Sequence, residues 1–185
     1  MKTLVITDVQ RDFFHPEGSL YVAGGELLPA KILSVASGYD KVVITLDWHP
    51  GDHCSFAENG GPWPVHCVQY TQGAGLPDEF APIIARGKEE VQFFHKGWDR
   101  EREEYGAFDG LRYRPEYADI FEWFKASDEI HICGIAGDYC VKETARKILD
   151  HVPADKLKVL TDLICSIDDG TTLREFVEEY KLQTR

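Results

Sequence analysis

Cys140 stands where the chain could expose a reactive thiol, after an apolar run and a turn that contains Gly137. The run Ile130–Ile135 is typical of a buried strand, and a helix is predicted to begin near Asp138 or Tyr139. Unpaired N–H groups at the start of a helix stabilise a thiolate and can bind an oxyanion. We therefore predict that Cys140 is a nucleophile; a buried cysteine that only packs is the alternative.

A thiol nucleophile needs a proton acceptor, and Asp8 is the candidate because it follows the apolar run Thr3–Thr7. Partial burial at the end of a strand would raise the pKa of this carboxyl group toward a useful value. Lys96 follows the run Val91–Phe94 and could hold a carboxylate or stabilise negative charge. The alternatives are a solvated aspartate that caps a turn and an ordinary surface lysine.

A metal site is predicted around Asp47, which follows the apolar run Val42–Leu46. Residues two apart in an extended segment point the same way, so Asp47 and His49 can share one ligand. His66 would supply a third donor and leave coordination positions open. This set suits Zn²⁺, Fe²⁺ or Mn²⁺. His53 is predicted as a further ligand or a supporting group; ordinary hydrogen bonds in a histidine-bearing loop are the alternative.

Three aromatic residues lie near these positions in the sequence, namely Phe13, Trp63 and Tyr105. Their rings could form a slot in which a flat substrate ring stacks. Core packing is the alternative for each of them.

The elements that must position these residues follow from periodicity. Continuous apolar runs predict strands buried on both faces, at Thr3–Thr7, Val42–Leu46, Val91–Phe94, Ile130–Ile135 and Leu157–Leu160. Helical spacing is found over Glu26–Ser37, Glu116–Lys125, Tyr139–Asp150 and Thr172–Lys181. We predict an α/β fold with a doubly wound, mostly parallel sheet flanked by helices, in one domain spanning residues 1–185. In such sheets ligands bind beyond the carboxyl ends of the strands, where the candidate residues fall.

Composition narrows the classes of partner. The chain has 185 residues and a formal net charge of −12, which disfavours nucleic acid and anionic lipid. No apolar run approaches the roughly 20 residues that span a bilayer, and no signal peptide is recognisable. Five scattered cysteines indicate reduced thiols and a cytoplasmic protein, since disulfide frameworks normally pair their cysteines. We expect a small-molecule substrate, and the chain could also form a homo-oligomer.

Several motifs together resemble the isochorismatase-like cysteine hydrolases. Val5–Phe13 is similar to their D-x-Q-x-D-F opening, His95-Lys96-Gly97 to their lysine motif, and Gly134–Val141 to their nucleophile motif. Asp47-x-His49 combined with Trp63–Cys67 narrows the resemblance to the nicotinamidase/pyrazinamidase branch.

The resemblance implies a role for each candidate residue. The catalytic triad would be Asp8, Lys96 and Cys140, and the N–H groups of Ala136 and Cys140 would form the oxyanion hole. One divalent metal, zinc first, would be held by Asp47, His49 and His66, with His53 as an additional ligand. Phe13, Trp63 and Tyr105 would line the ring pocket, and a cis peptide would precede Ala136. The implied activity converts nicotinamide or pyrazinamide to the acid and ammonia through a thioester, a step in NAD salvage.

The sequence also departs from this family at three points, one of which is a loop between His49 and His53 that is shorter than in some relatives. Gly137 occupies a position where many members have threonine, and we expect looser hydrogen bonding there. The charged stretch Asp99–Glu104 is expected to be a solvated face. Two other functions stay open: hydrolysis of a different small amide, carbamoyl or vinyl-ether substrate, and a non-catalytic zinc protein that uses His53, Cys54, His66 and Cys67.

Overall fold

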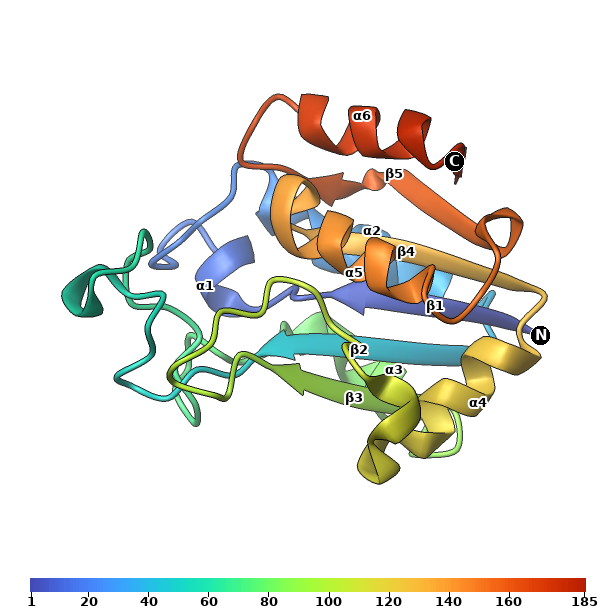
Figure 1. The fold of residues 1–185 in the computed structure, drawn as a ribbon, viewed down its shortest axis with the longest axis horizontal. Coiled ribbons are helices and arrows are strands. Elements are labelled where there is room, and N and C mark those ends of the chain that lie inside the picture. Colours follow the sequence, from blue (N-terminus) through green and yellow to red (C-terminus); the bar gives the residue numbers. More distant parts are fainter.

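One six-stranded sheet organises the computed structural model, which describes residues 1–185 (Figure 1). Its strands are β1 (Lys2–Thr7), β2 (Lys41–Asp47), β3 (Val91–Lys96), β4 (Glu129–Ile135), β5 (Leu157–Cys165) and β6 (Gln183–Thr184). Their order is β3-β2-β1-β4-β5-β6, and every neighbouring pair is parallel. The predicted α/β class and parallel sheet are confirmed. The missed strand, β6, has two exposed residues and therefore no apolar signal.

Helices cover both faces of this sheet, as the continuous apolar strands require. They are α1 (Arg11–Phe14), α2 (Leu28–Ala36), α3 (Ala81–Ile84), α4 (Ala118–Ala126), α5 (Lys142–Ile148) and α6 (Thr171–Glu179). Buried residues of α1, α2 and α3 pack in one core cluster, and those of α4, α5 and α6 in the other. Alternate residues of one strand serve the two layers: Leu4 and Ile6 enter the first cluster and Val5 the second.

Some element boundaries differ from the predicted ones, and the differences concern the site. The helix predicted over Tyr139–Asp150 is α5 over a shorter range, preceded by a π-helical turn at Gly137–Val141. Single π-helical turns are often found at functional positions. Strands β2 and β3 run one or two residues further than predicted, so Asp47 and Lys96 are their last residues. These two residues are register partners across the strand pair, which brings their side chains together.

The long segment between β2 and α3 gathers at the carboxyl end of the sheet, where Figure 1 shows its loops beyond the arrowheads of β2 and β3. It contains only 3-10 turns at Ala57–Asn59 and Asp78–Phe80, in keeping with its lack of periodicity. None of the helices combines the length and apolar character that a membrane span requires.

Candidate active site

The side chains of Cys140, Asp8 and Lys96 meet at the carboxyl end of the sheet. Asp8 directly follows β1, Lys96 ends β3, and Cys140 lies in the turn after β4. The Lys96 Nζ atom is 2.9 Å from Asp8 Oδ2 and 3.7 Å from Cys140 Sγ. All three residues are buried. The structure therefore brings the three residues predicted as catalytic into one water-poor cluster.

Lys96 links this cluster to Asp47 as well. Its Nζ donates to Asp47 Oδ1 and, at 3.2 Å, to the backbone carbonyl of Glu104. Burial opposes a positive charge, but Asp47 and Asp8 outweigh it and raise the pKa of Lys96 well above its ordinary value. Lys96 is thus a cation between two carboxylates, held to Asp47 by a hydrogen bond and to Asp8 by an ion pair.

The thiol and its expected base are both tuned by burial. Burial raises the pKa of the Cys140 thiol well above its usual value, against the opposing effect of Lys96. Burial also raises the pKa of Asp8, again against Lys96 and against a 2.6 Å hydrogen bond from Thr45 Oγ1 to Asp8 Oδ1. Cys140 lies in the first helical turn, as predicted, since the π-helical turn at Gly137–Val141 continues directly into α5. Desolvation opposes the thiolate that such a helix start would stabilise.

Asp47, His49 and His66 form a second buried cluster beside the first. The Nε2 atoms of His49 and His66 lie 3.6 and 3.9 Å from Asp47 Oδ2. Each ring is bonded through Nδ1 to a backbone carbonyl, that of Gly97 at 2.8 Å and that of Pro64 at 2.7 Å. With the proton on Nδ1, each ring donates to its carbonyl and keeps an oriented Nε2 lone pair, as in metal-ligating histidines. The three donor atoms lie within 4.8 Å of one another, so these residues fit one divalent ion.

Charge also favours a cation there. Burial would raise the pKa of Asp47, but Lys96 and His49 hold it well below its ordinary value. Two buried carboxylates, Asp8 and Asp47, face one buried ammonium group, Lys96. A divalent ion would offset the remaining negative charge, which is costly to bury alone.

His53 stands outside the group of three donors. Its Nδ1 is bonded to Ser55 Oγ at 2.7 Å and its Nε2 to the backbone carbonyl of Arg102 at 3.0 Å. The ring stacks at 4.1 Å from that of His49. The His53 ring thus connects the loop after β2 to the segment after β3, and it packs against the ring of His49.

The structural zinc site considered above is not assembled. The groups of histidine, cysteine and acidic residues close enough to hold an ion are Asp47–His49–His66 and Asp8–Asp47–Cys140. Cys54 and Cys67 belong to neither group, and all five cysteines are free thiols.

The turn before Cys140 offers an N–H group to a ligand. The Ala136 N–H makes no backbone hydrogen bond, whereas the Ala136 carbonyl accepts from Val141 N at 3.0 Å. Both Ala136 and Cys140 line the pocket described below. The peptide between Ile135 and Ala136 is cis, as the resemblance implied.

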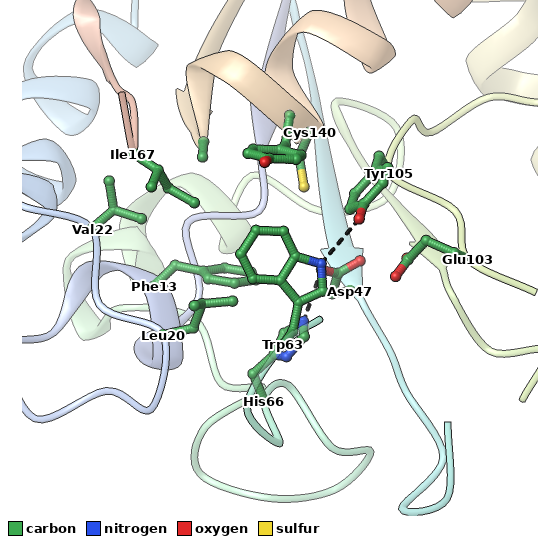
Figure 2. A pocket seen from close by; sticks show the side chains of 12 residues that line it. Phe13, Leu20, Val22, Asp47, Trp63, His66, Glu103, Tyr105, Cys140 and Ile167 are labelled. Atoms are coloured by element: carbon green, nitrogen blue, oxygen red, sulfur yellow. Dashed lines mark hydrogen bonds and ion pairs between the residues drawn. The ribbon is translucent and has the colours of Figure 1, made fainter. Parts of the chain in front are cut away.

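A pocket opens onto Cys140 and Asp47 (Figure 2). Phe13, Trp63 and Tyr105, the three aromatic residues predicted from sequence, all line it. The Trp63 indole N–H donates to the Tyr105 hydroxyl at 3.0 Å, which joins two segments over the cavity. Sequence reasoning missed five further lining residues: Leu20, Val22, Glu103, Tyr139 and Ile167.

Asp99–Arg102 are exposed, as expected for a solvated face, but Glu103 and Glu104 are not. Figure 2 places the Glu103 side chain beside Tyr105 at the pocket, and burial raises the pKa of its carboxyl group. Glu104 is also partly buried, and its carboxylate accepts the Gly97 N–H at 3.0 Å. Charge alone gave no signal of this burial, because the contacts come from segments distant in sequence.

The space beside Gly137 is filled by other parts of the chain. A Cβ atom at this position would lie 2.2 Å from Ser166 Oγ and 2.8 Å from Ile164 Cγ2. A threonine in place of Gly137 would therefore displace the end of β5 and the residue after it. The glycine at position 137 thus allows Ile164 and Ser166 to pack closely against the turn that carries Cys140.

A parallel α/β sheet with a buried thiol, carboxylate and ammonium group at its carboxyl edge places the chain among enzymes with a candidate cysteine nucleophile. More particularly, the chain belongs to the isochorismatase family, because residues 2–152 match the isochorismatase domain.

Relatives across nearly the whole chain narrow this assignment. The nicotinamidase of Saccharomyces cerevisiae is 32% identical over 98% of this chain and 96% of its own length. A structure from L. infantum in complex with nicotinate superposes with a TM-score of 0.84 at 30% identity, covering 100% of this chain and 92% of that one. The pyrazinamidase of Pyrococcus horikoshii in complex with zinc has a TM-score of 0.77 at 31% identity, covering 100% and 98%. The similarity to the nicotinamidase/pyrazinamidase branch is thus confirmed.

Proposed function

We propose that this protein is a metal-containing cysteine amidohydrolase that converts nicotinamide, and also pyrazinamide, to the acid and ammonia. One observation carries the proposal: Cys140 Sγ lies beside the Asp8–Lys96 ion pair at a pocket that also reaches Asp47 and His66. Relatives named as nicotinamidase and pyrazinamidase supply the substrate class.

In the first half of the reaction Asp8 takes the proton of the Cys140 thiol, and the sulfur attacks the carboxamide carbon. The N–H groups of Ala136 and Cys140 hydrogen-bond the oxygen of the tetrahedral intermediate. Asp8 then gives its proton to the amide nitrogen, the C–N bond breaks, and ammonia leaves a thioester on Cys140.

In the second half Asp8 takes a proton from water, whose oxygen attacks the thioester carbon. The C–S bond breaks, and Asp8 returns the proton taken from water to the sulfur as the acid departs. Lys96 keeps Asp8 in place through its 2.9 Å ion pair and offsets negative charge throughout. The raised pKa of Asp8 suits a group that must both accept and return a proton.

Asp47, His49 and His66 would hold the metal, which when bound supplies an electrophilic centre for the pyridine ring nitrogen. Zinc is our first choice, since two imidazoles and a carboxylate match its preferred ligands and a relative was solved with zinc. Phe13 and Trp63 would stack against the substrate ring. We place the enzyme in the cytoplasm, in salvage of the pyridine ring for NAD, and propose that it can form homo-oligomers.

The test is an ammonia-release assay on nicotinamide, with pyrazinamide, benzamide and acetamide as comparison substrates. Cys140→Ala should abolish turnover while circular dichroism stays unchanged, and Cys165→Ala, outside the pocket, should keep wild-type turnover. Metal-stripped enzyme should recover activity on addition of Zn²⁺. Nicotinamide turning over no faster than acetamide would refute the substrate assignment, and an active Cys140→Ala enzyme would refute the nucleophile.

A further inference from the structure

The Asp47 backbone lies where the sheet loses a strand. Strand β1 pairs with β2 only as far as Thr7 and Thr45. Asp8 has a φ of 49°, and the chain then turns away from the sheet. On its other side Asp47 is paired with Lys96 of β3. On the β1 side, therefore, no strand provides hydrogen-bond partners for the backbone N–H and carbonyl groups of Asp47, although the residue is buried.

The side chain of Gln10 takes the place of the missing strand. Its Oε1 accepts the Asp47 N–H at 2.8 Å, and its Nε2 donates to the Asp47 carbonyl, also at 2.8 Å. The second Nε2 hydrogen bond goes to the carbonyl of Ala74 at 3.0 Å. Gln10 is 0% exposed, so these bonds are formed without competing water. A primary amide provides the paired donor and acceptor of a peptide group, which no carboxylate or apolar side chain does.

Asp12, two residues after Gln10, fixes the backbone beside His66, another residue of the candidate metal site. Its Oδ2 accepts the Cys67 N–H at 2.8 Å, directly after His66. The Cys67 carbonyl in turn accepts the His49 N–H at 3.1 Å. Gly73 packs so closely that a Cβ there would lie 2.1 Å from Asp12 Oδ2. Asp12 is thereby fixed against one loop while it positions the backbone between two histidines.

We propose that Gln10 and Asp12 are positioning residues of the metal site. They hold the backbones from which Asp47, His49 and His66 project, and they touch neither substrate nor metal. The inference rests on the proposed function insofar as that function requires a metal at this site. Groups that orient metal ligands typically change metal affinity by about 10- to 100-fold when they are removed.

Five variants test this proposal: Gln10→Met, Gln10→Glu, Asp12→Ala, Asp12→Asn and, as a control, Gln92→Met. Gln92 also donates through Nε2 to a backbone carbonyl, that of Lys88, but near the opposite end of the sheet. The zinc dissociation constant of each purified protein is measured by competition with a chromogenic chelator. Urea unfolding of the metal-free proteins shows separately whether each variant is folded.

We expect zinc affinity to fall about 10- to 100-fold for Gln10→Met, Gln10→Glu and Asp12→Ala, and to stay at the wild-type value for Gln92→Met. Asp12→Asn keeps one oxygen for the Cys67 N–H and should lose less than Asp12→Ala. With nicotinamide, KM should rise more than kcat falls at saturating zinc, because the metal positions the ring.

Wild-type zinc affinity in folded Gln10→Glu and Asp12→Ala proteins would overturn the inference. Equal weakening by Gln92→Met would also overturn it, since the effect would then be a general loss of stability. A wild-type protein that binds no divalent metal would instead refute the metal site of the proposed function. Should Gln10→Met fail to fold, the Asp12→Asn and Asp12→Ala pair still decides the outcome.

Discussion

In the proposed reaction Asp8 is a base in one step and an acid in the next, and its surroundings set both tendencies. Burial and the neighbouring Asp47 raise its pKa, whereas Lys96 and the hydroxyl of Thr45 lower it. Because the folded-state pKa of Asp8 exceeds the unfolded value, its ionisation costs stability as pH rises past that unfolded value. A loss of stability of this kind is typical of active sites, where a group must both accept and release a proton.

A pH prediction follows for Thr45. Thr45→Val removes the 2.6 Å hydrogen bond to Asp8 Oδ1, which favours the carboxylate. The pKa of Asp8 should therefore rise further, and the acid limb of kcat/KM should move to higher pH. One lost hydrogen bond to a charged group is worth about 1.5–3 kcal/mol, so a shift of about one pH unit or more is expected. The measurement is kcat/KM for nicotinamide from pH 4 to 8 at saturating metal.

Thr7→Val is the matched control for this shift. Thr7 is also a buried strand threonine, one residue before Asp8, but its hydroxyl has no hydrogen-bond partner. Protonation of His49 and His66 affects both variants alike, so the difference between them reports Asp8. A limb that stays in place in Thr45→Val, or moves equally in Thr7→Val, contradicts the role given to this hydroxyl.

At the scale of elements, strands were predictable and most short turns were not. The apolar runs identified β1 to β5 because each strand is buried on both faces. The candidate catalytic residues follow these strands, and ligands of parallel sheets bind beyond the carboxyl ends of the strands, so these residues were expected to lie together. Helix α1 has four residues and no periodicity to detect. Its position depends on Gln10 and Asp12, whose partners lie more than 35 residues away in sequence. Such contacts leave no local pattern.

The closeness of β1 and β4 gives a prediction for Gly134. Its φ is 123°, and a Cβ atom there would lie 2.0 Å from the Thr7 carbonyl oxygen. Gly134→Ala must therefore strain β4 and push apart the two strands that carry Asp8 and Cys140. We expect the free energy of unfolding to fall by about 2–4 kcal/mol, measured by urea denaturation.

Gly51→Ala is the control, because a Cβ atom at that glycine meets nothing within 4 Å. We expect it to change stability by no more than about 1 kcal/mol in either direction. Wild-type stability in Gly134→Ala would show that these strands can separate without cost, contrary to the close packing described above.

For the whole molecule, the sequence predicted which residues gather at the site better than how the pocket is enclosed. Glu103, Ile167 and Val22 come from three segments whose meeting depends on the complete fold. The two core clusters, by contrast, are formed by helices and strands without help from the metal-ligand residues. We therefore expect the metal to complete the site, and the fold to persist when the metal is removed.

Chelation tests this expectation on the intact protein. Binding to the folded state alone stabilises by RT ln(1 + [M]/Kd), about 2.7 kcal/mol at a hundredfold excess over Kd. For a chain of this size the loss should lower Tm by about 5–11 °C, with a cooperative transition retained. His66→Asn, which removes one donor, should already have the lower Tm and respond little to chelator. Cooperative unfolding at room temperature on chelation would contradict this, because the metal would then be a structural element on which the core depends.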